Sequence, residues 1–129
     1  MSFYNKNDKI IFDIVIFDEN GNGYVFKSLL DTGSDITFIS NNIYNKLNFK
    51  SLSSGSMTVG NNETSSIKLV NLNLSLPNHK KYIFINVGVI PDKKDFDVIL
   101  GMDIISYCNI NILTATSGFD FHIELPLCK

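Results

Sequence analysis

The chain of 129 residues contains no arginine and only two cysteines. Without guanidinium groups it lacks the side chain that makes bidentate contacts to phosphate and guanine, and its net charge of −2 offers no excess of positive charge. We therefore expect no nucleic-acid partner. No apolar run approaches the roughly 18 residues that a membrane-spanning helix needs, so we expect no membrane partner either.

Residues 1–9, MSFYNKNDK, are polar and lack the apolar segment of a signal peptide. Cys108 and Cys128 could pair, but two cysteines without an export signal favour free thiols in a reducing compartment. These features predict a cytoplasmic protein. His79 and His122 belong to no cluster of metal-ligating residues, so we expect no metal ion and no other cofactor.

The overall composition is that of a globular protein, with 44% hydrophobic and 19% charged residues. The length is that of one domain with a proper hydrophobic core. No repeat, linker or low-complexity segment divides the chain. We therefore expect residues 1–129 to form a single domain.

Strand patterns dominate the sequence. Residues 9–17 and 24–30 are rich in apolar, largely β-branched and aromatic residues, and the polar segment 18–23 predicts a hairpin turn between them. Further strands are predicted at 36–40, 67–76, 80–90, 96–101, 109–113 and 119–125. Short helices are expected after Ser40 or Asn41 and after Gly101. The strand pattern is therefore all-β with one or two short helices, consistent with a small barrel closed on itself.

Two of these strands carry specific predictions about burial. In residues 67–76 the Val and Leu side chains alternate with Asn71, Asn73 and Ser75, so we expect one buried and one polar face. Residues 80–90 are apolar on both faces, which predicts a central strand covered on both sides.

The stretch 28–40, SLLDTGSDITFIS, ends an apolar strand on Asp31. An Asp-Thr-Gly triplet alone is a weak signal, because Asp and Gly also favour ordinary β-turns. Its setting is more specific. Two leucines precede the triplet, Ser34 follows it, and much later residues 98–101, VILG, end on a glycine before a helical turn. This joint pattern favours a catalytic loop over a plain turn.

This ordered set of sequence motifs resembles that of the retropepsin-like aspartic proteases, which are single-domain relatives of pepsin and include the retroviral enzymes. The resemblance extends from about Ile10 to Leu125, and residues 95–110 and 119–126 are more similar to bacterial and cellular members than to retroviral ones. It implies a small closed acid-protease-like barrel with one lobe per chain. It also implies an aspartic endopeptidase with Asp31 as the catalytic residue. Two carboxylates about 3 Å apart cannot both ionise and share one proton, so the ionised one activates a water molecule while the other hydrogen-bonds the scissile carbonyl.

The chain holds a single Asp-Thr-Gly, and its other aspartates, Asp103 among them, lack the Thr/Ser-Gly continuation. The resemblance therefore implies that the second carboxylate is Asp31 of another copy, related by a two-fold axis. The expected partners are a second copy of the chain and a peptide or protein substrate. A segment of 28 residues follows Gly101, longer than in the retroviral enzymes, so their dimer interface is not transferred to this chain.

The neighbours of Asp31 acquire roles by the same resemblance. Gly33 supplies an amide N–H close to the carboxylate, and Thr32 hydrogen-bonds across the dimer. Gly101 lets the second aliphatic strand pack under the Asp31 loop. Ser34 stands where many retroviral enzymes have Ala. We predict that its hydroxyl donates to Asp31, favours the ionised carboxylate and shifts the pH optimum towards acid.

Asp35 matches an aspartate that binds the main chain of the substrate. In retroviral enzymes an Arg after the second glycine pairs with it, whereas this chain has Met102 there. A substrate contact and a structural cap therefore both remain open for Asp35.

Residues 54–66 are expected to form a flap that closes over the substrate, excludes water and contributes main-chain donors. The predicted substrate-binding residues at the flap tip are Val59, Gly60 and Asn61. A mobile loop without ligand contact is the alternative for this segment.

The alternative function is a non-catalytic, dimeric peptide-binding or scaffolding domain on the same fold. A scaffold has no need for an intact Asp-Thr-Gly-Ser, and a buried pair of carboxylates costs stability. The sequence therefore favours the enzyme.

Overall fold

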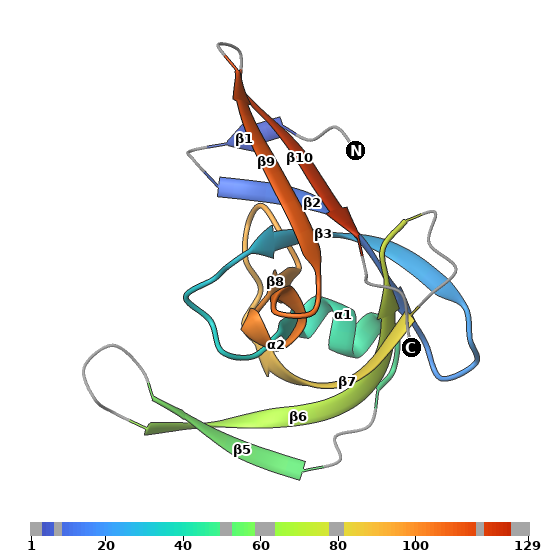
Figure 1. Cartoon of the computed structure of the whole chain (residues 1–129). Coiled ribbons are helices and arrows are strands. Elements are labelled where there is room, and N and C mark those ends of the chain that lie inside the picture. Colours follow the sequence, from blue (N-terminus) through green and yellow to red (C-terminus); the bar gives the residue numbers. More distant parts are fainter. Residues whose placement is uncertain are drawn as a thin grey trace.

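The computed structural model describes residues 4–6, 9–49, 53–58, 64–77, 82–115 and 118–124. Strands make up most of this part of the chain, together with two short helices (Figure 1), which confirms the predicted all-β class. The elements in order are β1 (Tyr4–Lys6), β2 (Lys9–Phe17), β3 (Gly23–Leu30), β4 (Phe38–Ser40), α1 (Asn41–Lys46), β5 (Ser53–Thr58), β6 (Thr64–Ser75), β7 (Tyr82–Ile90), β8 (Val98–Leu100), α2 (Met102–Ile105), β9 (Asn109–Ala115) and β10 (Gly118–Glu124).

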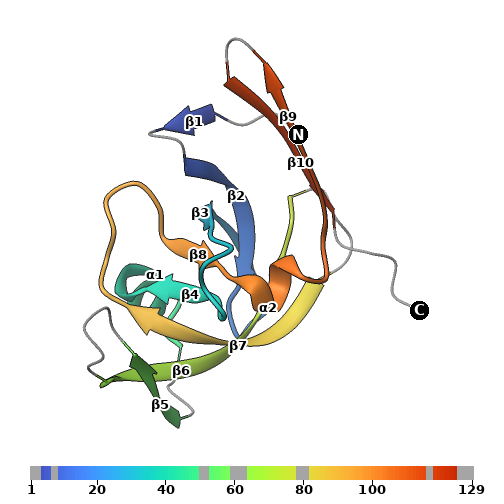
Figure 2. The ribbon, with the colours of Figure 1, turned by 60° about the vertical axis from the view of Figure 1, so that its left-hand side comes forward.

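The main sheet has eight strands in the order β1-β2-β3-β8-β4-β7-β6-β5. A further antiparallel pairing of β2 with β6 closes β2, β3, β8, β4, β7 and β6 into a ring, so the predicted closed barrel is confirmed. Two pairings in the ring are parallel, β3 with β8 and β4 with β7. The strands β9 and β10 form a separate antiparallel hairpin that projects away from the ring (Figure 2).

The turn between β2 and β3 is held by the side chain of Asp18. Its Oδ1 accepts hydrogen bonds from the backbone N–H groups of Asn20 and Asn22, both at 2.9 Å. These bonds favour the ionised form, and the backbone N–H of Asn22 is the main cause of the lowered pKa of Asp18. Gly21 provides the positive φ of 85° that the turn requires.

Helix α1 begins where the sequence predicted it, and Ser40 is its N-cap. The Ser40 hydroxyl accepts from the backbone N–H of Ile43 at 3.3 Å, which satisfies one of the free donors of the first turn. Asp92 accepts from the backbone N–H of Asn42 at 2.8 Å and satisfies a second. Ile43 and Leu47, four positions apart, are both buried in the core.

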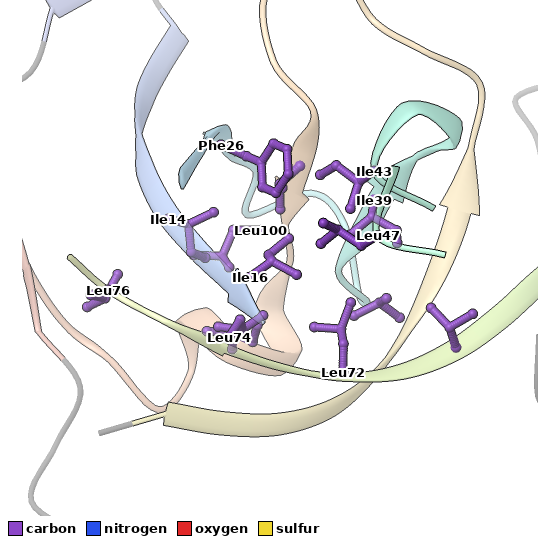
Figure 3. Close-up of a cluster of buried hydrophobic side chains, with 14 of the residues drawn as sticks. Ile14, Ile16, Phe26, Ile39, Ile43, Leu47, Leu72, Leu74, Leu76 and Leu100 are labelled. Carbon is purple, nitrogen blue, oxygen red and sulfur yellow. The ribbon is translucent and has the colours of Figure 1, made fainter. Parts of the chain in front are cut away.

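Apolar side chains from the barrel strands and from α1 fill the interior (Figure 3). Full burial of one such aliphatic side chain stabilises the fold by about 2 kcal/mol, and this burial holds the ring closed. The labelled members of the cluster are Ile14, Ile16, Phe26, Ile39, Ile43, Leu47, Leu72, Leu74, Leu76 and Leu100.

Two predictions about burial were wrong in part. The first half of β7 is not covered on both faces, because the side chains of Tyr82 and Phe84 are 64% and 66% exposed on the outer face of the sheet. Only the second half, around Val87 and Val89, is buried as expected. Ser75 is buried rather than solvated, since it pairs with Val15 where β6 meets β2 and the ring closes.

Within the described ranges, no helix is long and apolar enough to span a membrane. Within the segment 54–66, β5 and β6 pair antiparallel, with Thr58 opposite Thr64, and residues 59–63 lie outside the described residues.

Candidate active site

Asp31 is the first residue after β3, and the pairing of β3 with β8 continues through it. Its backbone N–H donates to the carbonyl of Leu100 at 3.0 Å, so the Asp31 loop starts directly beside the end of β8. The loop then turns at once, because the backbone N–H of Ser34 donates to the Asp31 carbonyl at 3.2 Å. The side chain is thus held at the edge of the barrel, partly exposed.

One carboxylate oxygen of Asp31 has a fixed partner. The backbone N–H of Gly33 donates to Asp31 Oδ1 at 2.9 Å, the kind of contact that the sequence predicted for this glycine. For Oδ2 the described part of the chain provides no hydrogen-bond donor. An ordered carboxylate with one oxygen bound and one available can take a proton from, or share one with, a group outside this chain.

The Asp31 loop, residues 31–37, rests on the corner between β8 and α2 (Figure 2). The backbone N–H groups of Met102 and Asp103 donate to the carbonyls of Ser34 at 2.7 Å and Asp35 at 3.1 Å. The loop is therefore attached by main-chain bonds along its length and not only at Asp31.

Gly101 lies at the tightest point of this contact. A Cβ atom at this position would come within 2.2 Å of the Ile36 carbonyl oxygen and 2.9 Å of the Ser34 carbonyl oxygen. Both are main-chain atoms, which cannot move aside as a side chain can. Close packing of the second strand under the Asp31 loop is thus possible with glycine alone.

The prediction for the Ser34 hydroxyl was wrong. Its Oγ donates to the carbonyl of Ile36 at 2.7 Å and not to the carboxylate of Asp31. The reason is local, because the main chain curls after Ser34 and brings the carbonyl two residues later within reach of the short side chain. The predicted acid shift of the pH optimum therefore loses the contact on which it depended.

Thr32, Gly33 and Asp35 are exposed, so the loop presents its polar tip to the surroundings. Asp35 contributes its backbone carbonyl to the contact with α2, while its side chain faces solvent. The structure therefore brings together Asp31, Thr32, Gly33, Ser34, Asp35 and Gly101 in one region. Val59, Gly60 and Asn61 lie outside the described residues.

A pair that the sequence reasoning missed lies at the end of the loop. Thr37 is completely buried, and its N–H and hydroxyl both donate to the carboxylate of Asp103, at 2.9 Å and 2.7 Å. Asp103 had been set aside because no Thr/Ser-Gly follows it. An acidic residue in the first turn of a helix indicates an acceptor for main-chain N–H groups, but it does not indicate that the donor is Thr37.

The other nucleophiles and ligands are not arranged for catalysis in the part of the chain that is described. Cys108 is a free, half-buried thiol that donates to the Ile104 carbonyl at 3.3 Å, and burial raises its pKa to about 11. It is therefore a thiol and not a reactive thiolate at neutral pH. Across the described ranges, no group of three or more His, Cys, Asp or Glu residues could hold a metal ion.

Several solved structures share this fold. The EIAV protease in complex with the inhibitor HBY-793 has a TM-score of 0.60 and 19% identity, over 80% of this chain and 90% of that one. A retropepsin-like aspartic protease from Rickettsia conorii has a TM-score of 0.57 and 15% identity, over 95% and 89% of the two chains. The retroviral protease-like domain of Ddi1 from Leishmania major has a TM-score of 0.53 and 16% identity, over 95% of both.

The fold is thus that of the retropepsin-like aspartic proteases. The family model for aspartyl proteases matches residues 18–104, and the chain belongs to this family. Among curated proteins, none matches the sequence.

Proposed function

We propose that the chain is an aspartic endopeptidase that acts as a homodimer, with one Asp31 carboxylate from each copy at the catalytic centre. The observation that carries this proposal is the state of Asp31. Its Oδ1 is held by the N–H of Gly33, and its side chain remains partly exposed at the edge of the barrel. Membership of the aspartyl protease family supports the same chemistry.

The chemistry follows from two carboxylates that share one proton. The ionised carboxylate accepts a proton from a water molecule as that water attacks the scissile carbonyl carbon. The protonated carboxylic acid donates a hydrogen bond to the carbonyl oxygen, which becomes negatively charged in the tetrahedral intermediate. A proton then passes to the leaving nitrogen and the peptide bond breaks.

The need for two copies rests on the sequence and on the site. The chain has one Asp-Thr-Gly, so a second equivalent carboxylate requires a second chain. Thr32 is exposed beside Asp31, where its hydroxyl is available to a partner copy. The exposed Asp35 would contact the substrate, and the β5–β6 hairpin, with Val59, Gly60 and Asn61, would close over it.

Mass-spectrometric cleavage of a diverse peptide mixture tests this function, from about pH 3.5 to 7 to include the range in which paired carboxylates share a proton. Wild type is compared with Asp31→Asn and with Asp13→Asn, a matched change in an exposed ion pair with Lys27. Cleavage is expected from wild type and Asp13→Asn and not from Asp31→Asn. A folded wild-type dimer that binds peptides without cleaving any would instead favour the peptide-binding module.

A further inference from the structure

The carboxylate of Asp103 meets both polar groups of one buried residue. Its Oδ2 accepts from the backbone N–H of Thr37 at 2.9 Å, and its Oδ1 accepts from the Thr37 hydroxyl at 2.7 Å. Thr37 is the last residue of the Asp31 loop and is fully buried, whereas Asp103 belongs to α2. This two-point contact therefore joins the end of the loop to the helix.

A third hydrogen bond fixes the direction of the Thr37 hydroxyl. The backbone N–H of Gly101 donates to Thr37 Oγ1 at 3.1 Å, so this oxygen serves as an acceptor there and its own proton goes to Asp103. The residue at position 103 must consequently accept two hydrogen bonds. A carboxylate does so with its two oxygens, whereas the amide of Asn offers one oxygen and would direct an NH₂ group at a donor.

The same few residues connect this contact to Asp31. The loop carbonyls of Ser34 and Asp35 are bound by the backbone N–H groups of Met102 and Asp103. The main chain of Ile36 lies so close to Gly101 that no Cβ fits between them. The loop is therefore held by main-chain contacts between Asp31 and Thr37. A displacement of Thr37 would consequently displace Asp31.

We propose that Asp103 is a positioning residue for Asp31, and that it acts through the buried Thr37. Its two acceptor oxygens hold the Asp31 loop in one register on α2 and so set where the Asp31 carboxylate lies. This proposal rests on the proposed function for its catalytic consequence, because two carboxylates must meet at about 3 Å to share a proton. A displacement of roughly 1 Å at such a centre costs on the order of 100-fold in rate.

The kinetic test uses Asp103→Asn with two variants of its partner. Thr37→Ser keeps the hydroxyl and is expected to retain wild-type kinetics, whereas Thr37→Val has the same shape as Thr without the hydroxyl. Asp103→Asn and Thr37→Val are expected to lower kcat by roughly 10- to 100-fold and to change KM by less than about twofold. Wild-type kcat in folded Asp103→Asn and Thr37→Val would overturn the proposal.

A second readout does not depend on activity. Amide hydrogen exchange of Gly33 and Ser34, whose N–H groups bond to Asp31, is measured by NMR in wild type and in the same variants. Exchange in Asp103→Asn and Thr37→Val is expected to be faster by about 10-fold at these two amides, with Leu72 in the distant core strand β6 unchanged. A merely structural role would raise exchange at all three amides together, and that result would overturn the proposal.

The two readouts separate the two proposals. If wild type cleaves no peptide, the proposed function fails, while local exchange at Gly33 and Ser34 still decides whether Asp103 positions the loop. If wild type cleaves peptides and the folded variants change neither kcat nor exchange, the function stands and the positioning role fails. If Asp103→Asn does not fold, the comparison of Thr37→Ser with Thr37→Val supplies the same decision.

Discussion

The backbone N–H of Asp31 donates to the carbonyl of Leu100 at 3.0 Å. This bond extends the parallel pairing of β3 with β8, in which Leu30 lies opposite Leu100. Parallel strands end at the same edge of a sheet, so the loop after β3 and the helical turn after β8 meet there. Two segments far apart in the sequence thereby form one site.

Replacement of Gly101 by Ala is expected to destabilise the fold strongly. The new methyl group would lie 2.2 Å from the Ile36 carbonyl oxygen. This steric clash can be removed only if the Asp31 loop moves away from β8 and α2. Overpacking of this kind costs about 3 kcal/mol or more when the neighbour is main chain. Urea denaturation of wild type and Gly101→Ala measures the loss. A loss below about 0.5 kcal/mol would contradict the packing role.

Two serines are expected to respond to alanine in opposite directions. Ser28 on β3 is 0% exposed, and its hydroxyl has no hydrogen-bond partner among the described residues. Ser28→Ala should therefore raise the free energy of unfolding by about 1 kcal/mol, because an unsatisfied buried hydroxyl is removed. Ser40→Ala should lower it by about 1–2 kcal/mol, since Ser40 caps α1 and donates to Asp97. If thermal or urea unfolding showed that both variants change the free energy of unfolding in the same direction, this contrast would be refuted.

Much of the fold could be predicted because its signals are local. The length of β2, the turn at residues 18–23, the N-cap Ser40 and the C-terminal hairpin all follow from neighbouring residues. Their apolar periodicity and turn chemistry act over a few positions. The Asp-Thr-Gly at residues 31–33 was recognisable for the same reason.

The features that could not be predicted from the sequence depend on contacts between segments that are distant in the chain. The partnership of Thr37 with Asp103 spans 66 positions, and no local pattern at either residue shows that they meet. Ser34 was assigned to Asp31 because the two are neighbours in sequence, yet the curl of the main chain offers it the nearer Ile36 carbonyl. The exposure of Tyr82 and Phe84 likewise depends on which layer covers β7, and an apolar strand pattern does not encode that.

The thiol of Cys108 is expected to react slowly. Burial raises its pKa from 9.0 to about 11, so little thiolate is present at pH 8. In a Cys128→Ser background, iodoacetamide alkylation of the folded protein should reach half its maximal rate near pH 11, and near pH 9 in urea. A midpoint near pH 9 in the folded protein would contradict the burial.

The raised pKa of Cys108 also predicts how the free energy of unfolding depends on pH. The pKa is raised in the folded state, so the unfolded chain loses the proton first as the pH rises. The contribution of Cys108 to stability is complete below about pH 9 and is lost as the pH rises towards about 11. Cys108→Ala should remove this part of the pH dependence of urea unfolding. An unchanged slope between these two pH values would contradict it.

Ser34→Ala distinguishes the observed contact from the one expected by resemblance. With the hydroxyl on the Ile36 carbonyl, its removal should leave the pH optimum of cleavage within about 0.3 pH units of wild type. The free energy of unfolding should fall by about 1 kcal/mol, because one side-chain hydrogen bond is lost. A pH–rate profile that moves clearly upward would show that the hydroxyl acts on Asp31 after all.

The most direct test of catalysis by two copies is a mixing experiment. Wild type and Asp31→Asn are unfolded together, refolded at constant total concentration, and assayed for peptide cleavage as the wild-type fraction is lowered. If each active dimer needs Asp31 from both chains, mixed dimers are inactive, and the rate falls with the square of the wild-type fraction. An equal mixture would then retain about one quarter of the wild-type rate. Retention of about one half, in a linear series, would show that a single chain suffices and would contradict the shared catalytic centre.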